Sequence, residues 1–318
     1  MPRKRTHPRV NELPGTTALC LSIAGLCLHY RGGERIRLAA PSKSYSTFLR
    51  ASPADGPCID TVEMEVVEGE VPRPDLLSMV FNTGDTWSLL SDARRHVFRM
   101  NVASGTAIPQ WSITVDRGFN HGRIYCSDDL ITQSGKSRLA HGIIQYPLDQ
   151  ILTVHVGLAR SGSMLMHAAG GTIGGQGLLF AGCAGTGKST ISKLLGNTQN
   201  ARFLSDDRIV LRRFGSKLAM YGTPWHGEAG IALNESVPLK ALCFLRQGNT
   251  TELTRLDPKQ ARERLLPLAS VPSYEPALAE RANELCDFLI SRYPAFDLSF
   301  RPETEEIESV LNDFSRAA

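Results

Sequence analysis

The sequence predicts an α/β domain that follows a β-rich N-terminal domain. Short apolar runs recur between residues 15 and 145 and are broken by Gly, Pro, Asp or Ser about every eight to twelve residues, as in β-rich domains. Further along, a glycine-rich loop at 182–190 lies between an apolar strand and a helix with an apolar stripe. A third apolar run, 201–205, ends on two aspartates. Together these observations define the two domains.

The character of the sequence changes near Tyr146-Pro147, which we take as the domain boundary. We expect a disordered basic tail over 1–14, a β-rich domain over 15–145 and the α/β domain over 146–318. The sequence of the β-rich domain shows no nucleophile motif, ligand cluster or phosphate loop. Recognition or scaffolding is therefore the default expectation for it.

Composition excludes several classes of protein. Of the 318 residues, 42% are hydrophobic and 21% are charged, which is typical of a globular protein. The net charge of +3 is too small to predict a nucleic-acid partner. Seven cysteines without a CxxC pair indicate neither a disulfide framework nor a zinc site. Reduced thiols and a cytoplasmic location follow as expectations.

The apolar run 18–28 follows a basic start and has two interpretations. It could be the core of a signal peptide, or a half-buried strand in which Leu19, Leu21 and Ile23 alternate with smaller residues. No convincing cleavage site follows, so we favour the strand. The run is also too short to span a bilayer, and we expect no membrane partner.

The α/β domain divides into recognisable elements. Residues 148–160 have helical spacing after Pro147, and 257–266 and 277–292 are also expected to be helical. Residues 164–169 and 178–181 predict two strands joined by a tight turn at 174–177. In the N-terminal domain, the expected strands include 87–90, 96–102 and 111–115.

The glycine-rich loop matches the pattern of a P-loop, which binds the phosphates of ATP. Glycines let successive backbone N–H groups turn toward phosphate oxygens, and the positive end of the following helix lies beneath them. Lys188 is expected to reach the β- and γ-phosphates, and Ser189 to place its hydroxyl on Mg²⁺. The expected nucleotide-binding residues are Gly182, Cys183, Ala184, Gly185, Thr186, Gly187, Lys188, Ser189 and Thr190.

Asp206 and Asp207 end an apolar strand about 20 residues beyond the loop, where P-loop proteins hold their metal ion. One carboxylate can serve Mg²⁺ while the other accepts the proton of an attacking hydroxyl. An Asp-Asp pair can also be a simple turn or helix cap.

Two further features are weaker candidates. His167 lies on the strand whose hairpin partner leads into the loop, so it could approach the γ-phosphate, or it could be a packed strand residue. The stretch Thr223–Gly230 places Trp225, His226 and Glu228 between glycines. This stretch could line an acceptor site and add Glu228 to the metal site, or it could be a structural turn.

Three stretches in order, Met166–Gly170, Gly177–Thr190 and Leu204–Arg208, resemble the catalytic domain of the HPr serine kinase/phosphorylase family. They are nearest to HPr-kinase-like proteins associated with peptide maturation, such as lasso-peptide tailoring kinases. The resemblance covers roughly 146–310 and extends to the core of phosphoenolpyruvate carboxykinase. It implies an α/β P-loop kinase domain of the HPr-kinase/carboxykinase type behind the β-rich domain.

The resemblance also implies roles for single residues. His167 matches the active-site histidine of the family, and Asp206 and Asp207 match its paired aspartates. Asp206 is preferred as the base and Asp207 as the metal partner, with the reverse order open. Ala168 and Ala184 depart from the family pattern, and the loop that docks HPr has no counterpart, so HPr itself is not the expected substrate.

The leading functional hypothesis is an ATP- and Mg²⁺-dependent kinase. Its acceptor is a hydroxyl, with serine favoured, on a small protein, a peptide or a metabolite. The alternative is a nucleotide-binding regulatory module that transfers no phosphoryl group, and a carboxykinase is a third possibility. A homo-oligomer is suggested by analogy with the family alone.

Overall fold

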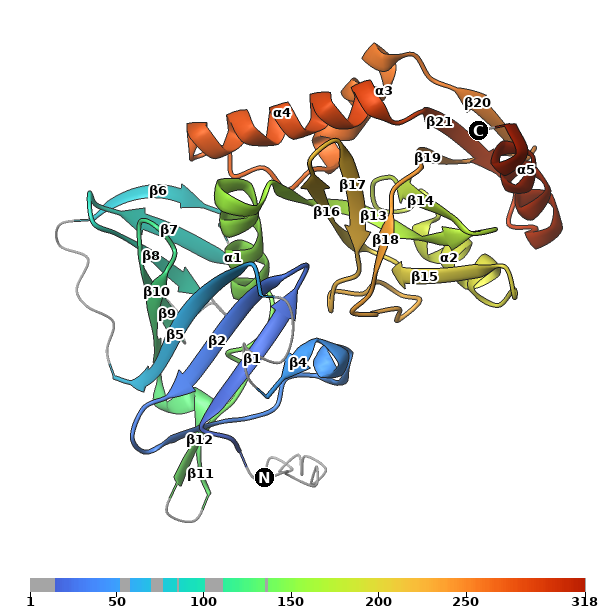
Figure 1. The fold of residues 1–318 in the computed structure, drawn as a ribbon. Coiled ribbons are helices and arrows are strands. Elements are labelled where there is room, and N and C mark those ends of the chain that lie inside the picture. Colours follow the sequence, from blue (N-terminus) through green and yellow to red (C-terminus); the bar gives the residue numbers. More distant parts are fainter. Residues whose placement is uncertain are drawn as a thin grey trace, which may run out of the picture. The chain divides into compact units, whose positions relative to one another are not determined.

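The computed structural model describes residues 15–51, 58–69, 77–84, 86–100, 111–134 and 137–317 (Figure 1). The predicted basic tail, 1–14, lies outside the described residues. The chain forms two compact units. The first contains the described parts of Met1–Leu19, His29–Ser42 and Glu63–Gln145, and the second contains the described parts of Cys20–Leu28, Lys43–Val62 and Tyr146–Ala318. The boundary expected at residue 146 coincides with the start of the longest segment of the second unit.

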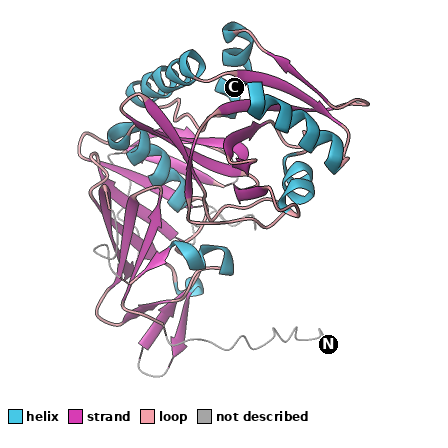
Figure 2. Ribbon diagram, turned by 45° about the vertical axis from the view of Figure 1, so that its right-hand side comes forward, coloured by secondary structure: helices cyan, strands magenta, loops and turns pink. Residues whose placement is uncertain are grey.

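Strands dominate the first 145 residues, whereas the α-helices of the described chain belong to the second unit (Figure 2). A nine-stranded sheet has the order β4-β1-β2-β5-β10-β9-β8-β7-β6, and a smaller sheet has the order β11-β12-β3. Their bounds are β1 Ala18–Ile23, β2 Leu26–Gly32, β3 Ile36–Leu38, β4 Leu49–Arg50, β5 Asp60–Glu68, β6 Ser78–Asn82, β7 Trp87–Ser91, β8 Arg95–Met100, β9 Trp111–Asp116, β10 His121–Cys126, β11 Ile131–Ser134 and β12 Ser137–Ala140. Short 3₁₀ helices cover Lys43–Phe48 and Asp128–Leu130. The strands expected at 87–90 and 111–115 are confirmed, and that at 96–102 is confirmed up to Met100, with its last two residues outside the described chain.

The run 18–28 forms two strands instead of the single strand that we expected. The chain turns at Ala24 and Gly25, which both have positive φ angles of 51° and 82°. Cys20, Ser22 and Ala24 are buried like the larger residues between them. The alternation in the sequence is therefore not a sign of half-burial, because this hairpin is covered on both faces.

A disulfide joins Cys27 to Cys58, so the expectation that the thiols are all reduced is wrong for this pair. The two residues are 31 positions apart in the sequence, and no short spacing motif could have revealed them. Their pairing results from the fold, which brings the start of β2 beside the segment that precedes β5.

The second unit is built on a mixed sheet with the order β18-β17-β16-β13-β14-β19-β21-β20, and β15 pairs with β13. The strands are β13 Ser163–Ile173, β14 Gln176–Ala181, β15 Ala201–Ser205, β16 Arg208–Phe214, β17 Lys217–Tyr221, β18 Ser236–Pro238, β19 Ala241–Gln247, β20 Glu252–Arg255 and β21 Ala295–Phe300. The helices are α1 Leu148–Val156, α2 Lys188–Gly196, α3 Pro258–Leu265, α4 Pro276–Arg292 and α5 Thr304–Ala317, with a π-helical turn at Gly157–Ser161 and a 3₁₀ turn at Leu266–Leu268. β14, β19 and β21 are parallel to one another, so their carboxyl ends share one edge.

Most of the predicted elements of this unit are confirmed, and their local causes are visible. Gly174 and Gly175 have φ angles of 55° and 78°, which suits the tight turn between β13 and β14. Asp257 caps α3 in a reciprocal capping box with Gln260. The helix expected over 148–160 is α-helical only to Val156 and continues as the π-helical turn.

α2 and α5 contribute to one buried core with the central strands. Ile191 and Leu195 of α2 lie in the same apolar cluster as Ile307 and Leu311 of α5, and all four are fully buried. This packing fixes the start of α2, which carries Lys188, against the edge where β14, β19 and β21 end. Among the described residues, no helix is both long and apolar enough to cross a bilayer.

Candidate functional site

The glycine loop leaves β14 after Ala181, and α2 begins at Lys188. Gly185 and Gly187 have φ angles of 82° and 103°, which favour glycine over residues with a side chain. Space is also restricted, because a Cβ on Gly187 would lie 2.5 Å from Cζ of Phe300. The loop therefore needs its glycines both for the backbone turn and for close packing on the end of β21.

Lys188 is buried at the base of this loop. Its Nζ donates hydrogen bonds to the carbonyl oxygens of Gly182 and Cys183, at 2.8 and 3.0 Å. Burial lowers the pKa of Lys188, and the negative charges of Asp207 and Asp206 partly oppose this shift. The ammonium group is thus held where the loop curls, while Cys183, Ala184 and Gly185 are exposed on its rim.

Asp206 is fully buried, and four donors hold its carboxylate. Oδ1 accepts the backbone N–H groups of Gly227 and Ile231, at 2.9 and 3.2 Å. Oδ2 accepts the N–H of Ala229 at 2.8 Å and the hydroxyl of Ser189 at 3.3 Å. Asp206 therefore connects the first turn of α2 to the loop 222–231.

Asp207 is half-buried and forms a pair with His167. Nε2 of His167 lies 3.0 Å from Oδ1 of Asp207, and Nε of Arg208 lies 3.2 Å from Oδ2. The pairing of β13 with β16 places His167 opposite Arg208, which explains this contact. Burial alone would raise the pKa of Asp207, but the hydrogen bond from His167 and the charges of Arg208, His167 and Lys188 lower it below its ordinary value.

These groups meet around a cavity of about 280 Å³. Six of the residues that line it come from the glycine loop and the start of α2: Ala184, Gly185, Gly187, Lys188, Ser189 and Thr190. His167 and Asp207 also line it, together with Gly227 and Glu228 from the loop 222–231 and Gln247 from the end of β19. Four of the predicted site residues do not line this cavity: Gly182, Cys183, Thr186 and the buried Asp206.

Two residues of this cavity were not predicted from the sequence. Nε2 of Gln247 donates a hydrogen bond to the carbonyl oxygen of Gly185 at 2.8 Å and supports the loop from the β19 side. Gly227 donates its backbone N–H to Asp206. The glycine-flanked stretch 223–230 pointed to the region of Gly227, whereas nothing in the local sequence singles out Gln247.

The donor set fits a magnesium ion that also binds phosphate oxygens. Magnesium keeps several waters and takes one or two protein ligands in such sites. The Ser189 hydroxyl with the carboxylates of Asp206, Asp207 and Glu228 supplies oxygen ligands of the right kind. Within the described residues, no group of three or more His, Cys, Asp or Glu side chains forms a metal site by itself. The metal roles of Ser189, Asp207 and Glu228 stay predictions.

A buried carboxylate also positions the loop 222–231 from behind. Oδ2 of Asp149, in the first turn of α1, accepts hydrogen bonds from the hydroxyl of Tyr45 at 2.6 Å and from Nε1 of Trp225 at 2.9 Å. Burial raises the pKa of the Asp149 carboxyl to about 6, against the lowering effect of these hydrogen bonds. Trp225 is two residues from Gly227, so the Asp149 network and Asp206 hold opposite sides of one short segment.

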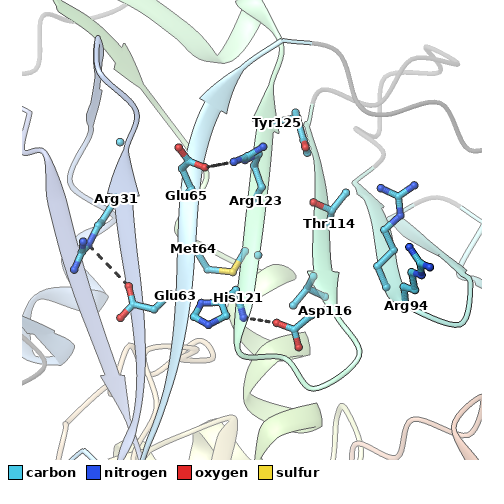
Figure 3. Close-up of a pocket in the computed structure, with 14 residues that line it drawn as sticks. Arg31, Glu63, Met64, Glu65, Arg94, Thr114, Asp116, His121, Arg123 and Tyr125 are labelled. Carbon is cyan, nitrogen blue, oxygen red and sulfur yellow. Dashed lines mark hydrogen bonds and ion pairs between the residues drawn. The ribbon is translucent and has the colours of Figure 1, made fainter.

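A second cavity, of about 660 Å³, lies on the first unit (Figure 3). Side chains of β5, β9 and β10 form its floor, and Arg31 and Arg94 lie at its sides. Most of its charges pair with one another: Arg123 contacts Glu65 at 2.6 Å, and Arg31 lies 3.9 Å from Glu63.

No protein-family model matches the chain, and no curated protein matches it in sequence. Among solved structures, the chain is similar to the HPr(Ser) kinase/phosphatase from Coxiella burnetii. The sequence identity is 14% and the TM-score 0.31, over 48% of this chain and 97% of that chain.

The close approach at Gly227 gives a first prediction. A Cβ there would lie 2.8 Å from Oδ2 of Asp206 and 3.2 Å from Oγ of Ser189. Gly227→Ala should therefore lower the free energy of unfolding by about 1–3 kcal/mol in denaturant titrations. Gly196→Ala is the matched control, because its Cβ would meet only Cδ2 of Phe203, at 3.9 Å. Equal effects of the two substitutions would contradict the described packing around Asp206.

The buried Asp149 gives a pH prediction. Its raised pKa means that the folded state binds the proton of this carboxyl more tightly than the unfolded state does. The protonated carboxyl therefore adds to the free energy of unfolding at low pH, and this contribution is lost as the pH rises through about 6. Relative to Asp149→Asn, the free energy of unfolding of the wild type should fall by up to about 3 kcal/mol between about pH 4 and pH 7. Urea titrations across this range measure it, with the exposed Asp287→Asn as control. Parallel curves for wild type and Asp149→Asn would contradict the assignment.

Proposed function

We propose that this chain is an ATP- and Mg²⁺-dependent kinase that transfers the γ-phosphoryl group to a hydroxyl. The acceptor hydroxyl, a serine by preference, belongs to a small protein, a peptide or a metabolite. The observation that carries the proposal is the His167–Asp207 pair, which lines the same cavity as Lys188 and the glycine loop. A binding module needs the loop and one metal carboxylate, but it has no need of a second carboxylate beside the phosphate site.

The phosphates are assigned to the loop amides and Lys188. Backbone N–H groups of the loop and the amino end of α2 favour negative charge there. Lys188 already lies at the base of the loop and adds a positive charge in a partly desolvated position. In this role, these groups neutralise charge on the β- and γ-phosphates as the phosphoryl group moves.

The magnesium ion is assigned to the hydroxyl of Ser189, which Asp206 positions. The hydrogen bond from the Ser189 hydroxyl to Asp206 supports this assignment, because it holds the two oxygens together next to the phosphate loop. When bound, the metal would neutralise charge on the phosphate oxygens. Asp206 is a poor candidate for the proton acceptor, since it is fully buried and already accepts four hydrogen bonds.

The base role is therefore assigned to Asp207, the reverse of the order that the sequence favoured. Asp207 lines the cavity, and its lowered pKa keeps the carboxylate ionised, which a proton acceptor must be. The acceptor oxygen attacks the γ-phosphorus as the bond to the β–γ bridging oxygen breaks. ADP leaves, and the hydroxyl proton passes to Asp207. His167 orients the carboxylate through the hydrogen bond to Oδ1.

Asp207→Asn tests this assignment. We expect label transfer from γ-labelled ATP to the acceptor to fall by about 10²–10⁴-fold, because the amide cannot take the proton. The dissociation constant of MgATP should change by no more than about threefold, since Asp207 is not assigned to the phosphates. Short peptides encoded beside the gene are the first acceptors to test, and the surface variant Asp287→Asn is the matched control.

The same assay separates the alternatives. If Asp206→Asn and Asp207→Asn both left transfer intact, neither aspartate would be catalytic. If ATP bound tightly and no hydroxyl were ever labelled, the chain would be a nucleotide-binding regulatory module. The proposal itself predicts that Asp206→Asn weakens the binding of MgATP more than the binding of metal-free ATP. The substitution removes the carboxylate that holds the Ser189 hydroxyl in place for the metal.

A further inference from the structure

The strand that leads into the glycine loop, β14, lies between β13 and β19, and the two neighbours bring different residues to the loop. On one side lie β13 and the start of β16, which carry His167 and Asp207 next to each other. On the other side lie β19 and β21, whose last residues, Gln247 and Phe300, both contact the loop. If the γ-phosphoryl group faces Asp207, as the proposed function requires, the opposite side of the loop, toward β19 and β21, is open to the remainder of the nucleotide.

A cavity of about 560 Å³ lies on that second side. It is formed by the loop that follows β19 and by the first turns of α5. Its volume falls within the range of about 300–1,000 Å³ that is typical of ligand pockets. It also lies beyond the carboxyl ends of parallel strands, where nucleotides bind in open α/β sheets.

The wall of this cavity is tied to the residues that support the glycine loop. Gly248 donates its backbone N–H to the carbonyl oxygen of Phe300 at 3.1 Å. The backbone N–H of Arg301 donates to the hydroxyl of Thr251 at 3.2 Å, and that hydroxyl donates to Glu306 of α5 at 2.8 Å. The cavity therefore begins one residue beyond Phe300, the ring that packs on Gly187.

The polar groups of the cavity suit a nucleoside better than a phosphate. Glu305 and Glu306 bring two carboxylates against one guanidinium, that of Arg301, so the lining has a net negative charge. Carboxylates accept hydrogen bonds from sugar hydroxyls and exocyclic amino groups, and they repel phosphate oxygens. The Nη2 atom of Arg301 donates to the carboxylates of Glu303 and Glu306, which hold the flat guanidinium in a position from which it can stack on a base.

We propose that the cavity between the 248–251 loop and the start of α5 binds the nucleoside half of ATP. The inference rests on the proposed function, because it takes the direction of the nucleotide from the position of Asp207. It assigns to Arg301, Glu305 and Glu306 the recognition of base and sugar, a role separate from phosphate binding by the glycine loop.

Calorimetric titrations with ATP and with inorganic tripolyphosphate, both in Mg²⁺, test the proposal on the full chain. The wild type should bind ATP at least about tenfold more tightly than tripolyphosphate. Ser309→Trp, which fills the cavity from α5, should weaken ATP by about tenfold or more and change tripolyphosphate by less than about twofold. Glu306→Gln should weaken ATP by about threefold to tenfold, again without affecting tripolyphosphate. Glu284→Trp, at an exposed position of α4, is the control for adding a tryptophan.

The outcomes separate this proposal from the kinase proposal. Equal affinities of the wild type for ATP and tripolyphosphate would overturn the nucleoside site and leave the phosphate loop intact. Unchanged ATP binding in Ser309→Trp, or a parallel loss of both ligands in both cavity variants, would also overturn it. If the wild type bound neither ligand, the proposed function itself would fail.

Discussion

The buried carboxylate of Asp206 is the interaction on which the candidate site depends. It accepts three backbone N–H groups from the loop 222–231 and the hydroxyl of Ser189 at the start of α2. A buried carboxylate without partners would cost several kcal/mol, whereas one with this many donors is stabilised and fixed in orientation. One side chain therefore sets the distance between the glycine loop and the segment that carries Gly227 and Glu228.

The order of the strands places different residues on the two flanks of the candidate site. β15 ends at Ser205, directly before Asp206 and Asp207, on the edge where β14 enters the glycine loop, because both strands run antiparallel to β13. The central position of β14 leaves one flank to His167 and Asp207 and the other to Gln247 and Phe300. Reactive groups thus gather on one flank and supporting contacts on the other, which is the basis for assigning the two ends of the nucleotide.

The sequence alone predicted the local parts of this arrangement well. The loop, the hairpin before it and the strand that ends at Asp206 each depend on nearby residues, and glycine spacing or apolar periodicity reveals them. The division of labour between Asp206 and Asp207 could not be predicted in this way. It depends on which carboxylate faces Gly227, Ala229 and Ile231, more than twenty positions away in the chain.

Other features were beyond the sequence for the same reason. The partners of Asp149 are Tyr45 and Trp225, which lie about a hundred and about eighty positions from it, and the bond of Cys27 to Cys58 also spans distant segments. Gln247 looks like an ordinary polar end of an apolar strand until β19 is placed beside β14. Long-range pairing, which no local pattern encodes, decides each of these contacts.

A crystal structure of the chain with Mg²⁺ and a non-hydrolysable ATP analogue tests the central claim most directly. The account predicts the phosphates within the 182–188 loop, the metal next to the Ser189 hydroxyl on the Asp206 side, and the Asp207 carboxylate facing the γ-phosphate. It would be contradicted by a structure in which Asp206 leaves the amides of the loop 222–231 to face the γ-phosphate, or in which the phosphates lie outside the glycine loop.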